Sequence, residues 1–245
     1  MILRSVGIAT VLALAPNVAE GPFLVPDMPT VGPLSRPVGA GWFQAVEPTV
    51  ARLQYGGGGD WYAGPSAIAN LLAAIRERTG FVVAEREAVV TLLDPMLRDY
   101  PFLYMTGHGN VAFNEQERQA LRSYLEAGGF LHADDNYGLD EALRREMAAL
   151  FPSQPLVEIP PDHPVFHTFY EFPDGLPKIH EHDGESPEAW GIFHEGRLVV
   201  FYSYESDLGN GWEDPSVHDD PPELREQALR MGVNLFVYAL TRQMP

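Results

Sequence analysis

The fold class follows from residues 100–138, which read YPFLYMTGHGNVAFNEQERQALRSYLEAGGFLHADDNYG. Two short apolar runs in this stretch, 102–106 and 130–133, have the length and composition of buried strands. Between them, Asn114 and Glu117 have the spacing of a capping box at the start of a helix, and Gly128-Gly129 ends that helix. A strand, a helix and a strand in this order predict a parallel sheet covered by helices.

The residues on either side continue this alternation. Residues 51–55 predict a strand, and Pro65 begins a helix that Gly80 ends. A second strand lies at 81–83 or at 89–93, and apolar residues at helical spacing between 139 and 150 mark a further helix. We therefore predict a doubly wound α/β fold with helices on both faces of a mostly parallel sheet.

The pattern weakens in residues 151–220, which hold 15 of the 34 acidic residues, two basic residues and six of the eight histidines. Residues 198–203 still predict a strand, and Pro222 begins a last helix that reaches about Thr241 and packs back on the sheet. We interpret residues 49–245 as a single domain in which 151–220 is a His/Asp/Glu-rich elaboration of the core.

The composition excludes several classes of function. The formal net charge of −18 disfavours nucleic acid and anionic membrane surfaces, both of which require clustered basic residues. Because the chain has no cysteine, disulfides, thiolate metal sites and a cysteine nucleophile are excluded. Cations, neutral small molecules, carbohydrates and protein partners remain compatible with this charge.

The first 48 residues have a different character. Residues 1–15 combine Arg4 with an apolar run of signal-peptide length that is too short for a confident transmembrane span. The run is interpreted as an export signal, an ordinary buried strand or an incorrectly assigned start. Residues 16–48 are rich in proline and predict an extended arm.

Three loops each follow a predicted strand and precede a predicted helix. In open α/β sheets, ligands bind at the carboxyl ends of the strands, and a flavodoxin-like strand order would bring these loops to one crevice. Glycine-rich and polar residues of these loops are the predicted ligand contacts, although the first loop is neither a dinucleotide fingerprint nor a Walker A motif. The predicted ligand-binding residues are Gly57, Gly58, Gly59, Asp60, Trp61, Asn110, Asn136 and Tyr137.

The same loops hold the predicted catalytic residues. His108 lies between two glycines and is suited to proton transfer, metal binding or hydrogen bonding, with a backbone-bonded structural histidine as the alternative. The adjacent Asp134 and Asp135 are suited to holding a divalent cation or activating a hydroxyl, with capping of the next helix as the alternative.

The elaboration offers further candidates. His163 and His167, four residues apart, are predicted metal ligands, although Pro164 interrupts the helix that this spacing requires. His180 and His182 would share one face of an extended segment and form a second candidate pair. Aromatic and acidic residues that suit either sugar binding or a packed aromatic rim follow the strand at 198–203, and they are Tyr202, Tyr204, Glu205, Asp207 and Trp212.

Five stretches together resemble a bacterial family known as domain of unknown function 4159. These stretches are RLQYGGGGDWY (52–62), YPFLYMTGHGNVAF (100–113), GGFLHADDNYG (128–138), PPDHPVFHTFYEF (160–172) and GVNLFVYALT (232–241). The resemblance implies a flavodoxin-like three-layer sandwich of the class I glutamine amidotransferase-like and trehalose-utilisation-like group. It also favours export to the periplasm over a cytoplasmic location, because many members resemble exported or membrane-associated proteins.

Two functions are compatible with these residues. The turn at 133–136 falls where the resemblance places the amidotransferase nucleophile, but it carries Asp134 and Asp135 and no cysteine. We therefore expect a ligand-binding or assembly domain. The alternative is a metal-assisted hydrolase, with carbohydrate as the candidate substrate, in which His108 and Asp134 or Asp135 position a divalent metal and its bound water. A structural subunit of a membrane complex is a third interpretation.

Overall fold

The computed structural model describes residues 47–180, 182 and 184–241. The predicted export signal and nearly all of the proline-rich arm fall in residues 1–46 and so lie outside the described residues. The described residues belong to one compact unit that spans Ala40–Pro245. Within this described part of the chain, no helix has both the length and the apolar character that a membrane span requires.

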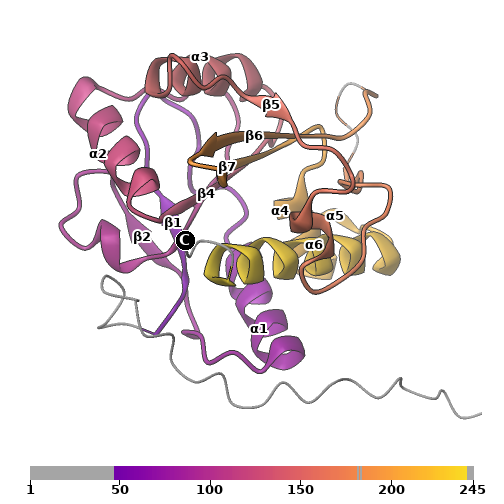
Figure 1. The fold of residues 1–245 in the computed structure, drawn as a ribbon. Helices are drawn as coiled ribbons and strands as arrows, with labels where there is room; N and C mark the ends of the chain where they lie inside the picture. Colours follow the sequence, from indigo (N-terminus) through magenta and orange to yellow (C-terminus); the bar gives the residue numbers. More distant parts are fainter. Residues whose placement is uncertain (1–46, 181, 183, 242–245) are drawn as a thin grey trace, which may run out of the picture. The chain divides into compact units, whose positions relative to one another are not determined.

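A seven-stranded sheet forms the centre of this unit (Figure 1). The strand order is β2-β1-β3-β4-β7-β6-β5, in which β2, β1, β3, β4 and β7 pair in parallel while β6 and β5 continue the sheet antiparallel. The bounds are β1 Val50–Leu53, β2 Ala88–Val90, β3 Phe102–Met105, β4 Phe130–Asp134, β5 Val157–Glu158, β6 Glu188–His194 and β7 Arg197–Tyr204.

Helices cover both faces of the sheet, which makes the unit a three-layer α/β sandwich. On one face, Trp212 of α4 and Phe236 of α6 share a buried cluster with Phe102 of β3. On the other face, Leu121 of α2 and Leu143 of α3 lie in a second buried cluster. The bounds are α1 Ala67–Thr79, α2 Glu115–Glu126, α3 Asp140–Leu150, α4 Leu208–Trp212, α5 Pro215–His218 and α6 Pro222–Thr241, with 3-10 turns η1 Leu97–Asp99 and η2 Pro164–His167.

The local signals for helix ends are confirmed at two places. Asn114 and Glu117 form a complete capping box at the start of α2, and Gly80 ends α1 at a φ of 71°, a left-handed conformation that glycine adopts without strain. Pro65 lies just before the N-cap Ser66, so α1 begins slightly later than predicted. Of the two alternatives for the second strand, the one at 89–93 is correct in position, with β2 at Ala88–Val90.

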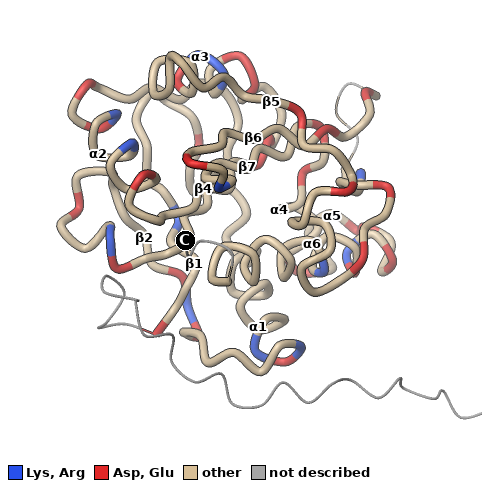
Figure 2. Tube along the Cα trace, in the orientation of Figure 1, with Lys and Arg blue, Asp and Glu red and all other residues tan. Residues whose placement is uncertain are grey.

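The elaboration at 151–220 supplies three of the seven strands, and most of the charged residues along its described trace are acidic (Figure 2). Its predicted strand is confirmed as β7, which pairs with β4 in the parallel part of the sheet. The sequence did not indicate β6, because Gly191 interrupts the run of strand-forming residues. Glycine allows close packing there, since a Cβ would lie 2.4 Å from Leu198 Cδ1 and would force that side chain to shift.

Candidate functional site

The carboxyl ends of β4 and β7 bring acidic residues from distant parts of the chain together. Asp134 pairs with Ser203 in the parallel ladder, and the next backbone amide, that of Asp135, donates to the Ser203 carbonyl at 3.2 Å. The chain then leaves β7 through Glu205 and Asp207 before α4 begins. Asp135 and Glu205 therefore lie on neighbouring strand ends, at the edge of the sheet where ligands of such folds bind.

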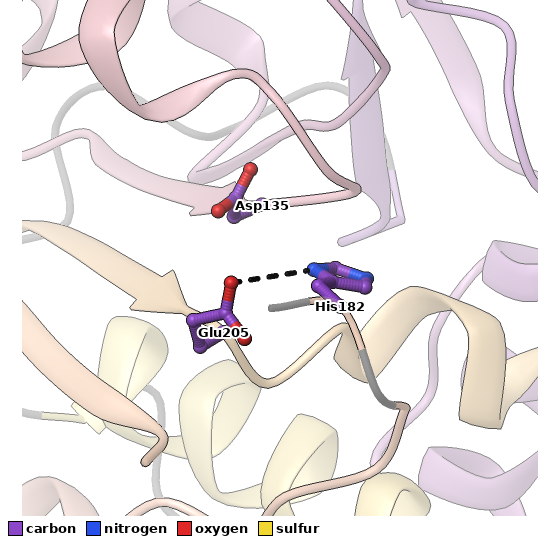
Figure 3. A group of neighbouring side chains, drawn as sticks. All are labelled: Asp135, His182 and Glu205. Carbon is purple, nitrogen blue, oxygen red and sulfur yellow. Dashed lines mark ion pairs between the residues drawn. The ribbon is translucent and has the colours of Figure 1, made fainter. Parts of the chain in front are cut away.

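Three side chains converge at this edge. Asp135, His182 and Glu205 each offer one ligand atom, and these three atoms all lie within 4.8 Å of one another. Figure 3 shows Glu205 and His182 facing each other across an ion pair, with Asp135 on the neighbouring strand end beside them. One imidazole and two carboxylates are a ligand set that divalent first-row metals accept.

A contact with Asp207 fixes the orientation of the His182 imidazole. Its side chain is only 5% exposed, and its Nε2 lies 3.1 Å from Asp207 Oδ2. A carboxylate only accepts hydrogen bonds, so Nε2 carries the proton, and in the neutral imidazole Nδ1 then carries a lone pair. This Nδ1 is 3.9 Å from Glu205 Oε1 and has no hydrogen-bond partner among the described residues. A buried imidazole nitrogen left unsatisfied in this way costs free energy unless a ligand engages it.

Asp207 is itself held firmly. It is the N-cap of α4, where its side chain accepts from the Asn210 backbone amide and from Asn210 Nδ2. The hydrogen bond between His182 and Asp207 raises the pKa of His182 and outweighs burial, which acts to lower it. Burial in turn raises the pKa of Asp135, although the Leu139 amide donates to Asp135 Oδ1 at 3.3 Å. A carboxylate–imidazole pair behind a metal ligand is the usual arrangement that fixes the tautomer of the ligand.

Lys178 places one positive charge beside the group. Its ammonium donates to Glu205 Oε2 at 2.7 Å and to the Glu185 carbonyl at 3.0 Å. Three carboxylates lie in the same region, those of Asp135, Glu205 and Asp207, and all are almost completely buried. A divalent cation would offset the negative charge that these buried carboxylates bring together.

Backbone strain is concentrated at the same place. Five non-glycine residues in the described part of the chain have positive φ, and three of them are Tyr137 at 71°, Glu205 at 55° and Asp207 at 57°. Each such conformation costs about 1 kcal/mol or more, and strain of this kind gathers at functional sites. Tyr137 is 53% exposed, and its ring meets His182 edge-on at a centroid distance of 5.6 Å.

Asp134, which is predicted to be catalytic, lies inside the fold and does not belong to the group of Asp135, His182 and Glu205. It is completely buried, and its two oxygens accept hydrogen bonds from four donors. These donors are Ser203 Oγ at 2.5 Å, Tyr104 Oη at 3.2 Å, Leu208 N at 3.2 Å and Gly209 N at 2.6 Å. Burial, followed by the nearby Asp207 charge, raises its pKa. Asp134 therefore joins β4 to the start of α4, and its catalytic role stays a prediction.

His132 extends this buried network. Its Nε2 lies 2.9 Å from Ser203 Oγ, and its ring packs among Phe102, Tyr104 and Trp212. Complete burial lowers its pKa from 6.5 to about 3. His132 is accordingly a neutral core residue.

We expect His132 to make the protein less stable as the pH falls. Because its pKa is lower in the folded state, the unfolded state binds one more proton between pH 6.5 and about 3. The free energy of unfolding should therefore fall by about 1.4 kcal/mol per pH unit through this group. Urea unfolding of the wild type and His132→Gln between about pH 4.5 and 7.5 measures the difference in slope. Identical slopes would contradict the prediction.

The first two predicted loops form a separate polar unit. His108 Nδ1 lies 3.0 Å from Asp60 Oδ2, and the Asp60 carboxylate also accepts from the His108 backbone amide. Burial acts to raise the pKa of Asp60, but these hydrogen bonds outweigh it and lower the pKa. His108 is 53% exposed, so the pair resembles the aspartate–histidine arrangement that orients a general base. It is distinct from the group of three ligands that contains Asp135.

The glycines of the first loop serve close packing. A Cβ on Gly59 would lie 2.8 Å from the Asn110 carbonyl, and Gly57, at a φ of 107°, accepts from Asn110 Nδ2 at 3.0 Å. Arg145 donates to the other end of the Asn110 amide at 2.9 Å. The other predicted ligand contacts differ in exposure: Gly58 is exposed, Trp61 is partly buried against the core, and Asn136 is buried.

His163 and His167 are engaged elsewhere. His163 Nδ1 accepts from the Val165 amide at 3.2 Å, where it caps η2. Both nitrogens of His167 have partners, since Nδ1 lies 2.5 Å from Glu171 Oε2 and Nε2 lies 2.8 Å from the Pro161 carbonyl. The group of three potential ligands, Asp135, His182 and Glu205, takes its imidazole from His182, a member of the other predicted histidine pair.

Comparisons with known proteins place the chain in one family. A search of curated proteins finds no match to the chain. The family model described as "Domain of unknown function (DUF4159)" matches residues 49–240, which include every residue of the site described above. The chain therefore belongs to the DUF4159 family.

Proposed function

We propose that this domain binds a divalent metal ion through Asp135, His182 and Glu205, and uses the ion to bind a small polar ligand. The observation that carries the proposal is the buried Nδ1 of His182, which is oriented by Asp207 toward the two carboxylates. The fold we propose for this site is flavodoxin-like and amidotransferase-like. The β2-β1-β3-β4-β7 order of its parallel strands supports this assignment.

The ligand set favours a first-row transition ion such as Zn²⁺ or Mn²⁺. Imidazole nitrogen suits these ions better than Ca²⁺ or Mg²⁺, which prefer oxygen ligands throughout. Three protein ligands also leave coordination positions for water or for a ligand oxygen, as in catalytic zinc sites. The acidic surroundings disfavour anionic ligands, so we propose a neutral ligand rich in hydroxyls, such as a carbohydrate. The exposed ring of Tyr137 beside His182 would support stacking of such a ligand.

A second candidate function is metal-assisted hydrolysis, and the Asp60–His108 pair favours it. Asp60 orients Nδ1 of an exposed imidazole, which suits Nε2 for proton transfer. The loop that carries His108 adjoins the Tyr137 loop. Gly138 and Gly109 lie so close that a Cβ added to Gly138 would be 4.0 Å from the Gly109 amide nitrogen. In this function the cation would supply an activated water and His108 would exchange protons with the substrate.

Metal analysis of the full chain tests the proposed cation site. Protein purified without chelators should contain close to one equivalent of a transition metal, and chelated protein should regain thermal stability when Zn²⁺ or Mn²⁺ is added. Absence of bound metal together with absence of a thermal shift would rule out the proposal.

A matched pair of histidine variants locates the ion. His182→Gln should lower Zn²⁺ affinity by roughly 100-fold, because it removes the nitrogen ligand. His180→Gln serves as the control, since His180 lies two residues away and outside the group of three. Equal losses in both variants would place the metal elsewhere on this loop.

A further inference from the structure

Lys178 occupies an unusual position in this chain. It is the single lysine among 16 basic residues, and its side chain is 20% exposed beside the proposed cation ligands. Its ammonium contacts Glu205 Oε2 at 2.7 Å and is tied to the Glu185 carbonyl at 3.0 Å. An ammonium so close to a proposed cation site repels the cation, so its presence calls for a physical explanation.

The contact limits how Glu205 can bind a metal. A carboxylate chelates an ion with both oxygens only when both can face it, and here the Lys178 ammonium covers Oε2 while Oε1 faces His182. Asp135 is limited in a similar way, because its Oδ1 accepts from the Leu139 amide at 3.3 Å. Each of the two carboxylates is thereby directed to offer one oxygen to the ion.

We propose that Lys178 is a specificity-determining residue, which holds Glu205 in one-oxygen coordination and so selects small transition-metal ions over Ca²⁺. This inference rests on the proposed function. Ca²⁺ requires six to eight oxygen ligands and commonly takes both oxygens of a carboxylate, whereas Zn²⁺ accepts four ligands with one atom from each. With Lys178 in place, the site supplies one nitrogen and two oxygens, which serves Zn²⁺ and leaves Ca²⁺ poorly coordinated.

The test compares Zn²⁺ and Ca²⁺ affinities of the full chain by calorimetry. Lys178→Met removes the ammonium at similar side-chain length and allows Glu205 to chelate. The ratio of the Ca²⁺ to the Zn²⁺ dissociation constant should fall by about tenfold or more in Lys178→Met. Lys178→Arg, which keeps a charged donor, should leave the ratio close to that of the wild type. If Lys178→Met strengthens both ions by the same factor, Lys178 acts only as a charge and the inference is wrong.

A measurement on the unmodified protein covers the case in which Lys178→Met does not fold. Because the chain has one lysine, growth with ¹³C-lysine yields one set of lysine side-chain signals. One equivalent of Mn²⁺ should broaden the Lys178 methylene signals beyond detection, and Zn²⁺ should shift them. Sharp, unmoved signals in protein that binds the ion through His182 would overturn the role of Lys178 alone. Failure of the wild type to bind any metal would instead overturn the proposed function.

Discussion

Asp135→Asn should abolish tight cation binding while leaving the fold intact. The substitution removes one of two anionic ligands from a buried site, and the amide oxygen that replaces it is a much weaker partner for a divalent ion. We expect Zn²⁺ affinity to fall by roughly 100-fold or more. Metal retained after purification should fall from near stoichiometric to trace amounts.

The fold should tolerate this change because of how Asp135 is held. Among the described residues, the side chain of Asp135 accepts one hydrogen bond, from the Leu139 amide at 3.3 Å, and an asparagine side-chain oxygen accepts that bond equally well. Burial raises the pKa of Asp135, so a neutral side chain at this position also avoids the cost of a buried charge. The free energy of unfolding without metal should therefore change by less than about 1 kcal/mol.

Two measurements together decide the role of Asp135. Calorimetric titration with Zn²⁺ gives the affinity, and urea unfolding of chelated protein gives the stability. Unchanged Zn²⁺ affinity would remove Asp135 from the proposed cation site. Lost affinity accompanied by a large loss of stability would show that the carboxylate supports the structure and does not bind the ion.

The position of Asp135 could be predicted from the sequence, whereas its partners could not. The apolar run at 130–133 and the helix signals after it place the acidic pair at the carboxyl end of a parallel strand. The pattern does not reveal which of the two acids faces the site. Strand alternation sends neighbouring side chains to opposite sides, and Asp134 is the one that lies buried against the amides at the start of α4.

His182 and Glu205 were visible only as separate candidates. His182 belonged to one of two possible histidine pairs, and Glu205 to a cluster after the strand at 198–203. Their convergence depends on β7 pairing with β4, a contact between residues about 70 positions apart that periodicity does not encode. His108 was singled out for its glycine neighbours, but its partner Asp60 comes from a loop 48 residues earlier.

Asp134→Asn, the same chemical change one residue earlier, should have the opposite effect and destabilise the fold. Each oxygen of Asp134 accepts from one backbone amide, Leu208 N on Oδ1 and Gly209 N on Oδ2. Whichever way an asparagine amide is oriented, its NH₂ group meets a backbone donor and leaves that donor unpaired. A buried unpaired donor costs about 1–3 kcal/mol, and the added contact between two donors brings the expected loss to about 3 kcal/mol.

Urea unfolding of chelated Asp134→Asn, Asp135→Asn and wild-type protein measures this contrast directly. The two variants carry the same change of charge, so a general electrostatic effect would alter both equally. We expect only Asp134→Asn to lose stability, because only Asp134 joins β4 to the amides at the start of α4. Its Zn²⁺ affinity should fall less than that of Asp135→Asn, since its carboxylate is buried behind the site. Full stability of Asp134→Asn, together with lost Zn²⁺ binding, would restore the predicted direct role of Asp134 and place the ion deeper than the group of three ligands.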